Sequence, residues 1–289
     1  MKKAFSLLLA LVLCLSLCAC GGESNSEKPN GSSNESATDY KTEVLGEWYD
    51  IKTSNRLVLN SDGSLEHYKD NFIPQPGNWT VDGNVIDVLA GTINNDLTIV
   101  NEGGILSLTN DEFTFARWEY VPKENLSIGE KGQKENIAIT MTSIVFTTEL
   151  PADIVEYVGR GPDADTYKLQ DGMVYAKITL DVSNLSKQEI NIPGISLKMD
   201  VMLDYNNGFR YATHDNAKSY FVSGASWVIH DGPGGQTGSD IPVQPLQSKT
   251  FDVYIACPEI ISTDTTSPLL VGIIASFESE VYYYEYKVR

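Results

Sequence analysis

The chain has 289 residues, of which 42% are hydrophobic and 10% aromatic, so it can bury the core of one or two domains. Its 21 basic and 39 acidic side chains give a formal charge of −18, which argues against nucleic acid as a partner, because binding a polyphosphate requires lysine and arginine to displace counterions. Three of the four cysteines lie in the first 20 residues, which excludes a disulfide-stapled scaffold and a cysteine-rich metal site.

The amino terminus has the pattern of a secretory signal peptide. Two lysines and an apolar run over residues 4–17 precede a polar tract, and the run is shorter than the roughly 20 residues that a membrane-spanning helix needs. The end of the run, with Leu17, Ala19 and Cys20, resembles the lipobox of bacterial lipoproteins. This resemblance implies that residues 1–19 are removed and that Cys20 carries a diacylglycerol. We therefore expect a lipid-anchored protein on the outer face of the cell membrane, in the style of a Gram-positive cell surface.

Residues 20–42 are expected to form the lipidated cysteine and a flexible tether. The tract is dominated by Ser, Asn, Gly and Glu and has no apolar periodicity. As a random coil of about 22 residues it would span roughly 26 Å. Removal of the signal peptide takes away its two lysines, so the mature chain has 19 basic and 39 acidic side chains, a charge of −20. Such a chain is not held to anionic lipid by charge.

The first folded block, residues 43–122, is a series of short strand-like runs separated by turns. The turns contain Asp62-Gly63, Asp82-Gly83 and Gly103-Gly104, which supply the positive φ of tight hairpins. We predict a small antiparallel barrel or meander. Its strands are expected at residues 56–59, 65–68, 85–89, 97–100, 105–108 and 113–120.

The order of features in this block resembles the small lipocalin-like domains of bacterial lipoproteins. The features are Gly46-Glu47-Trp48, Leu57 with Leu59, the Asp62-Gly63 turn and Gly77-Asn78-Trp79. The resemblance implies that Trp48 closes one end of a barrel. We favour core positions for Trp48 and Trp79 over a ligand-binding role, because a tryptophan buries a large area. A carrier function for a small apolar ligand would require a hollow barrel, which the sequence leaves open.

The second block, residues 126–289, has longer strands with clean alternation. In residues 173–183 apolar and polar side chains alternate, and the same pattern recurs at 197–205, 269–277 and 282–288. Repeated alternation without intervening amphipathic helices predicts an immunoglobulin-like β-sandwich, so the chain as a whole is expected to be all-β.

Two local features of the second block are also predicted. A short helix is expected at residues 151–158, with Ile154, Val155 and Val158 on one side. Cys257 shares the face of the apolar residues in the strand that begins at Phe251, which predicts a buried, unreactive thiol.

The second block resembles a family of extracytoplasmic bacterial domains that includes the mycobacterial immunoprotective extracellular antigen. The features that carry the resemblance are Ile128-Gly129 before residues 137–146, the strand end Val182-Ser183-Asn184, the paired strand over 203–211 and the strand over 251–258. The family implies a secreted or lipid-anchored immunoglobulin-like domain, a domain of unknown function without an assigned activity.

Catalytic and metal-binding patterns are weak. No histidine pair has metal-ligand spacing, and Ser226 lacks the second glycine of a nucleophile elbow. We therefore expect no catalytic residues, no enzyme activity and no cofactor, and we rank a glycan-acting hydrolase last. Calcium is a weak alternative, because we favour solvated turn positions over a Ca²⁺ site for the loop aspartates Asp163, Asp165, Asp231 and Asp240.

Residues 204–240 mix aromatic and adaptable polar side chains, as recognition surfaces do. The candidate binding surface comprises Tyr220, Trp227, His214 and His230. The alternative, which we favour for these rings, is a hairpin whose aromatic residues are core. The leading prediction is an anchored binding module that engages a protein or a cell-wall polymer through the sandwich loops.

Overall fold

The computed structural model describes residues 40–69, 73–90, 93–158, 169–192, 197–213, 219–223, 226–230, 236–238, 241–278 and 280–289. The predicted signal peptide, Cys20, most of the predicted tether, His214 and the four loop aspartates lie outside these residues. Within the described ranges, no helix is long and apolar enough to cross a membrane. The barrel and the sandwich described next belong to one compact unit.

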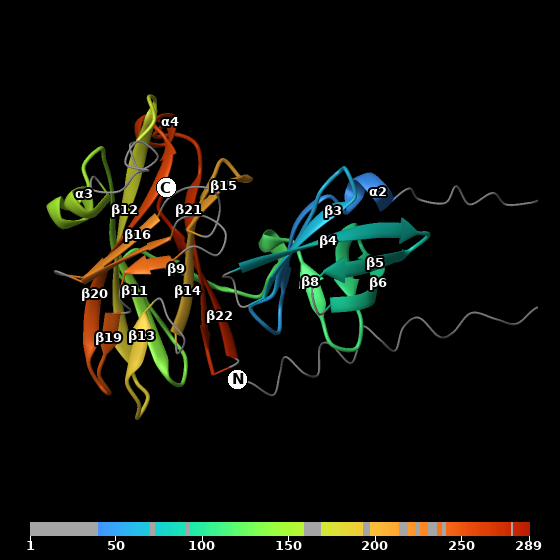
Figure 1. The fold of residues 1–289 in the computed structure, drawn as a ribbon, viewed down its shortest axis with the longest axis horizontal. Helices are drawn as coiled ribbons and strands as arrows, with labels where there is room; N and C mark the ends of the chain where they lie inside the picture. Colours follow the sequence, from blue (N-terminus) through green and yellow to red (C-terminus); the bar gives the residue numbers. More distant parts are fainter. Residues whose placement is uncertain are drawn as a thin grey trace, which may run out of the picture. The chain divides into compact units, whose positions relative to one another are not determined.

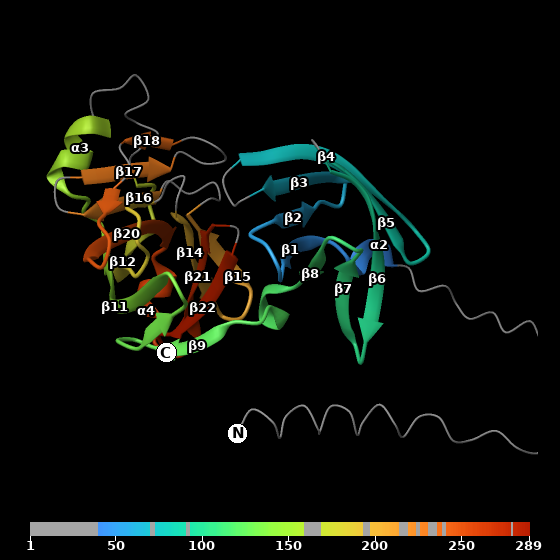
Figure 2. The same cartoon turned by 90° about the horizontal axis from the view of Figure 1, so that it is seen from below.

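Eight antiparallel strands in sequence order form a closed barrel, which is complete when β8 pairs with β1 (Figure 2). They are β1 (Gly46–Asp50), β2 (Arg56–Leu59), β3 (Ser64–Lys69), β4 (Ile73–Asp82), β5 (Val85–Ala90), β6 (Ile93–Glu102), β7 (Ile105–Thr109) and β8 (Thr114–Ala116). Gly63, Gly83 and Gly103 all have positive φ in the connecting turns, as predicted. The strand predicted at 113–120 is too long, because the chain leaves the barrel after Ala116 and turns into the 3₁₀ helix η1 (Trp118–Tyr120).

The interior of the barrel is filled by apolar side chains. The buried members of this cluster are Val44, Trp48, Leu57, Leu59, Leu65, Trp79, Ile86, Val88, Ala90, Leu97, Ile99, Leu108 and Phe115. The core positions predicted for Trp48 and Trp79 are confirmed, with exposures of 0% and 4%. The indole of Trp48 donates a hydrogen bond of 2.7 Å to the carbonyl of Val44, which follows the short helix α2 (Tyr40–Glu43). Small eight-stranded barrels are commonly filled in this way.

The second block is a β-sandwich of two sheets (Figure 1). One sheet has the order β10 (Lys131–Gln133), β11 (Ile137–Thr147), β12 (Met173–Asn184), β20 (Ser248–Pro258), β16 (Ser219–Ser223), β17 (Ser226–His230) and β18 (Gln236–Gly238). The other has the order β15 (Phe209–Ala212), β14 (Leu197–Tyr205), β21 (Leu269–Phe277), β22 (Glu280–Lys287) and β9 (Glu124–Ser127). A short pair joins β13 (Ile190–Ile192) to β19 (Ile241–Val243).

One apolar cluster lies between the two sheets. Ile139, Ile178 and Phe251 come from the first sheet, and Leu203 and Ile273 from the second. The predicted fold class, a small antiparallel barrel followed by an immunoglobulin-like β-sandwich, is confirmed. Among the strands that the structure describes, pairing is antiparallel except between β9 and β22, which run parallel. This pairing was not predicted, and it joins the first strand after the barrel to the last strand of the chain.

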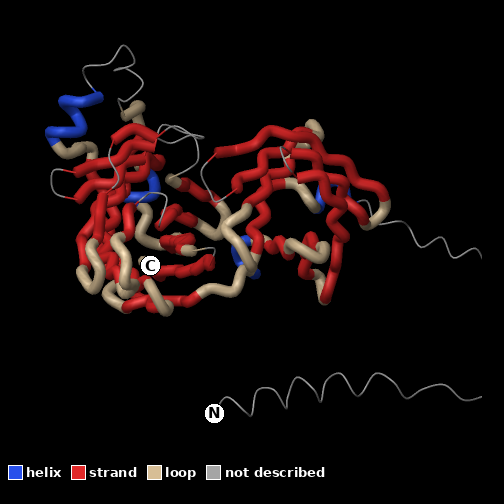
Figure 3. The backbone as a smooth tube through the Cα atoms, turned by 60° about the horizontal axis from the view of Figure 1, so that its bottom comes forward, coloured by secondary structure: helices blue, strands red, loops and turns tan. Residues whose placement is uncertain are grey.

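Helices are few and short among the strands (Figure 3). The predicted helix is present as α3 (Ala152–Val158), and α4 (Ile260–Thr263) is a further single turn. Only part of the predicted apolar face of α3 is correct, because Ile154 is fully buried whereas Val155 is 52% exposed. Ile154 packs on the outer face of the first sheet, against Tyr175 and Tyr254, and holds the helix there.

Cys257 is fully buried beside Val253 and Ile255, as its position in the alternating strand predicts. Burial raises the pKa of its thiol to about 12. The prediction of a buried core cysteine is confirmed.

Candidate functional site

The barrel and the sandwich meet at an aromatic joint built around Trp118. This residue lies in η1, in the segment that leaves the barrel, and it is 1% exposed. Its ring centroid lies 5.3 Å from that of Tyr49 in the barrel and 5.9 Å from that of Tyr283 in the sandwich, both in edge-on geometry. Met202 and Ile274 of the sandwich complete the same buried cluster. Edge-on aromatic pairs add to the stabilisation that burial provides.

Close packing at the joint depends on Gly272 in β21. A Cβ atom at this position would lie 2.7 Å from the Trp118 ring and 2.8 Å from the end of Met202. Real Cβ atoms do not approach other atoms so closely. The absence of a side chain at position 272 therefore lets the indole lie directly against the strand.

Tyr283 ties the sandwich to the first turn of the barrel. Its hydroxyl donates to the carbonyl oxygens of Asp50, at 2.6 Å, and of Thr53, at 3.0 Å. The Asp50 carboxylate in turn accepts from the backbone N–H of Thr114, at 3.1 Å, and from the Thr53 hydroxyl. Burial, together with the nearby charge of Asp50, raises the pKa of Tyr283 well above its ordinary value.

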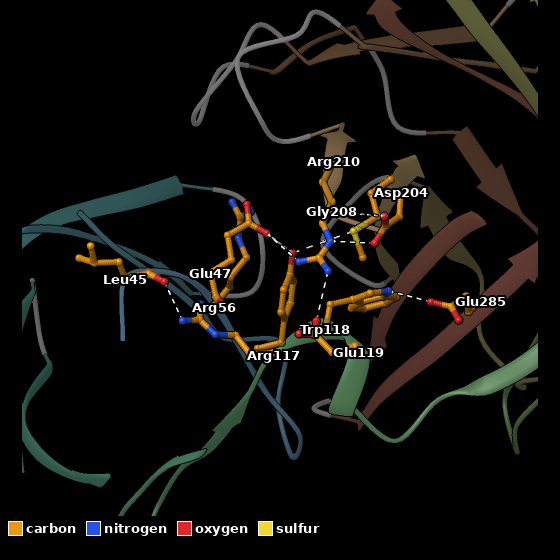
Figure 4. Close-up of polar contacts among 12 residues, drawn as sticks. Leu45, Glu47, Arg56, Arg117, Trp118, Glu119, Asp204, Gly208, Arg210 and Glu285 are labelled. Carbon is orange, nitrogen blue, oxygen red and sulfur yellow. Dashed lines mark hydrogen bonds and ion pairs between the residues drawn. The ribbon is translucent and has the colours of Figure 1, made fainter. Parts of the chain in front are cut away.

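Arg210 of β15 joins three carboxylates from the barrel, the connecting segment and the sandwich (Figure 4). Its Nε donates to Asp204 Oδ2 at 3.0 Å, and its Nη2 donates to Glu119 Oε2 at 3.4 Å. Its Nη1 lies 3.8 Å from Glu47 Oε2 of β1. Burial alone would lower the pKa of Arg210, but Tyr49 and the Asp204 and Glu47 carboxylates outweigh that effect and raise it.

The turn before Arg210 is fixed by its own residues. Asn206 and Asn207 have φ values of 53° and 57°, in the left-handed region that asparagine tolerates better than most residues. The backbone N–H of Gly208 donates to Asp204 Oδ1 at 2.9 Å. Asp204 thus holds the turn with one oxygen and Arg210 with the other.

A second polar group surrounds Trp118. Its indole N–H donates to Glu285 Oε2 at 2.9 Å, and Lys123 Nζ lies 3.7 Å from the same oxygen. Lys123 Nζ also donates to the Trp118 carbonyl at 2.7 Å and lies 5.0 Å from the centre of the indole ring. Burial lowers the pKa of Lys123, and the Glu285 charge opposes that shift.

Arg117 closes the barrel beside this group. Its guanidinium lies 3.9 Å above the Trp48 ring and donates to the carbonyls of Glu43 and Glu47, both at 2.9 Å, and of Leu45 at 2.6 Å. Burial lowers its pKa to about 10. The arginine therefore joins the end of β8 to the entry of β1.

Many of the side chains described above line an open cleft of about 760 Å³. Its walls come from the barrel, the connecting segment and the sandwich, and consist of Glu47, Arg117, Trp118, Glu119, Lys123, Asp204, Asn207, Gly208, Arg210, Leu270 and Glu285. A volume of this size is in the range of small-molecule sites, which often lie where domains meet. Chemically, the cleft offers fixed hydrogen-bonding groups and charges.

The structure places the predicted binding residues away from this cleft or leaves them undescribed. Tyr220 is fully buried and packs against Tyr175, with ring centroids 5.9 Å apart, so its ring is core, the alternative that we favoured. Trp227 and His230 lie in β17, whose side chains are not described, and His214 lies outside the described residues.

The predicted recognition segment, residues 204–240, does contribute Asp204, Asn207 and Arg210 to the cleft. Sequence reasoning missed the remaining walls. Trp118 was predicted to lie in a barrel strand, and no local pattern pairs it with Glu285, 167 residues away.

Among the residues that the structure describes, no group of three or more histidine, cysteine, aspartate or glutamate side chains could hold a metal ion. The aspartates considered for calcium lie outside those residues.

No family model matches the chain, and no curated protein matches its sequence. The resemblance of the sandwich to the immunoprotective antigen family therefore stays a prediction.

Several solved structures are similar to parts of the chain. An uncharacterized β-sandwich protein from Clostridium difficile is 24% identical, with a TM-score of 0.38, over 58% of this chain and 95% of its own. A presumed lipoprotein from Bacillus subtilis is 9% identical, with a TM-score of 0.27, over 54% of this chain and 37% of its own. A family 123 glycoside hydrolase from Clostridium perfringens is 12% identical, with a TM-score of 0.22, over 51% of this chain and 27% of its own. At these TM-scores the similarity identifies neither a family nor a function.

Proposed function

We propose that this protein is a lipid-anchored extracytoplasmic binding protein and that its ligand occupies the cleft where the barrel and the sandwich meet. The anchor is the diacylglycerol implied by the lipobox that ends at Cys20. Two acyl chains hold a protein stably at a membrane, whereas one does so only marginally. The ligand is a protein segment or a cell-wall polymer within reach of the tether.

The observation that carries this proposal is the way the cleft is built. Its polar groups hold one another in place, with Asp204 on Arg210 and Glu285 on Trp118, before any ligand arrives. Side chains that are already ordered lose little entropy when a ligand binds, which favours affinity. The proposal involves binding and no catalytic step.

A carrier role inside the barrel is less favoured. Trp48, Trp79 and Phe115 belong to one apolar cluster in the interior, and all three are buried. A ligand there would have to displace close-packed side chains, at a cost comparable to that of disrupting a core.

The site is tested with the mature chain carrying Cys20→Ser, which is unlipidated and soluble. Purified wall-polymer fragments are titrated into it by calorimetry, alongside Leu270→Trp and Ile105→Trp. Leu270 lines the cleft, whereas Ile105 lies in the barrel and is 42% exposed, so only the first substitution fills the cleft. We expect Leu270→Trp to abolish binding and Ile105→Trp to preserve it. Equal binding by the two variants would refute the cleft as the site.

The anchor is tested separately in cells. Cys20→Ser should release the protein from the membrane fraction or leave it unprocessed, and unchanged retention would show that the anchor lies elsewhere.

A further inference from the structure

The three cationic side chains that line the cleft already form hydrogen bonds or ion pairs with neighbouring protein groups. Arg117 donates to three backbone carbonyls and covers the Trp48 ring. Lys123 is bound to the Trp118 carbonyl and lies beside Glu285, and its side chain is only 8% exposed. Arg210 is divided among three carboxylates and is 18% exposed. These groups stabilise the cleft and have little capacity left for a ligand.

The carboxylates of the cleft are less completely used. Glu119 is 55% exposed, and among the described residues its hydrogen bond is the 3.4 Å contact with Arg210 through Oε2, with no partner for Oε1 within that part of the chain. Both contacts of Glu285 also use a single oxygen, Oε2. The acceptors that remain for a ligand are thus anionic oxygens, mainly that of Glu119.

The net charge of the cleft lining and of the mature chain is negative, like that of the unpaired carboxylate oxygens. Its lining contains four carboxylates and three cations, and the mature chain carries a charge of −20, from 19 basic and 39 acidic side chains. A cleft with low-dielectric walls and a net negative field concentrates cations from solution. An anionic ligand would meet Glu119, whereas the three cations in the described lining are already bound to other groups.

We infer that the cleft binds a cationic group of its ligand, a primary ammonium or a guanidinium, with Glu119 as the main charged contact. This inference rests on the proposed function, because it names the chemistry recognised in the same cleft. An ammonium has three donors and a guanidinium has five, and either can bond to the free Glu119 oxygen.

Three probes of equal length test this inference: 1,5-diaminopentane, 1,5-pentanediol and glutarate, which are cationic, neutral and anionic. Each is titrated by calorimetry into the unlipidated mature chain at low ionic strength, where screening is weak. We expect binding of the diamine alone, and we expect it to weaken as salt is added.

The matched variants are Glu119→Gln and Glu102→Gln. Both remove one exposed carboxylate, but Glu102 ends β6 in the barrel and does not line the cleft. We expect Glu119→Gln to weaken diamine binding about threefold to fivefold, the upper range for a partly exposed ion pair, and Glu102→Gln to change it by less than about 1.5-fold. A melting curve for each variant confirms that the fold is unaffected.

The outcomes separate the two proposals. If pentanediol binds as well as the diamine, or if the two glutamine variants behave alike, the cationic ligand is excluded. The cleft is still supported as the binding site in that case, provided that Leu270→Trp abolishes wall-polymer binding. If Leu270→Trp also leaves every ligand bound, the cleft itself is refuted. Failure of the diamine to bind at low salt overturns the inference directly.

Discussion

Replacing Trp118 by alanine should uncouple the barrel from the sandwich. Trp118 is 1% exposed, and its ring centroid lies 5.3 Å from that of Tyr49 and 5.9 Å from that of Tyr283. Its indole N–H donates a hydrogen bond of 2.9 Å to Glu285. Truncation of a buried tryptophan costs about 3–5 kcal/mol from lost burial and the cavity left behind. Because this side chain connects the two blocks, we expect the wild-type protein to unfold in one transition and Trp118→Ala to unfold in two.

The assay is calorimetric and urea-induced unfolding of the unlipidated mature chain, with Trp79→Ala as the control. Trp79 is also buried, at 4% exposure, but it lies within the barrel and bonds to the Asn60 carbonyl. That variant should lose comparable stability from the barrel alone. A Trp118→Ala protein that unfolds in one transition at the wild-type temperature would refute the role of the joint.

Three further predictions concern single groups. Arg117→Lys should destabilise the barrel by about 2–3 kcal/mol in urea unfolding, because a lysine cannot reproduce the fork that binds three carbonyls, and an unchanged midpoint would contradict this. Cys257 should not react with a thiol reagent at pH 8 until the protein is unfolded, because burial raises its pKa to about 12 and only the thiolate attacks; rapid labelling of the native protein would contradict the burial. Tyr283 stays protonated in the folded state while an unfolded tyrosine ionises near pH 10, so stability should fall as the pH rises above about 10, by up to about 1.4 kcal/mol per pH unit from this group. Tyr283→Phe should make that fall shallower, and an unchanged slope would show that Tyr283 does not contribute.

Much of the fold could be predicted because its signals are local. Glycines at the Asp-Gly and Gly-Gly turns require positive φ, so the hairpins of the barrel follow from neighbouring residues. Strict alternation in residues 173–183 predicts a strand with one buried face, and the buried Cys257 follows from the same rule. Val155 shows the limit of such patterns, because it lies on the predicted apolar side of α3 but is 52% exposed.

The cleft could not be predicted because its contacts are long-range. Arg210 and Glu119 are 91 residues apart, and Tyr283 bonds to Asp50 across 233 residues. Each of these side chains also has an ordinary surface interpretation in its local sequence. The need for glycine at position 272 becomes visible only when the Trp118 ring is placed against the strand.

The most direct test of binding at the cleft is site-specific photocrosslinking on intact cells. A diazirine amino acid of about the size of leucine, which does not fill the cleft, is placed at Leu270, which lines the cleft, or at Ile105, which lies in the barrel away from it. The account predicts an adduct with a cell-surface protein or wall polymer at position 270, lost on addition of excess 1,5-diaminopentane, and no such adduct at position 105. The same adduct at both positions, or an adduct at position 105 alone, would contradict binding in the cleft.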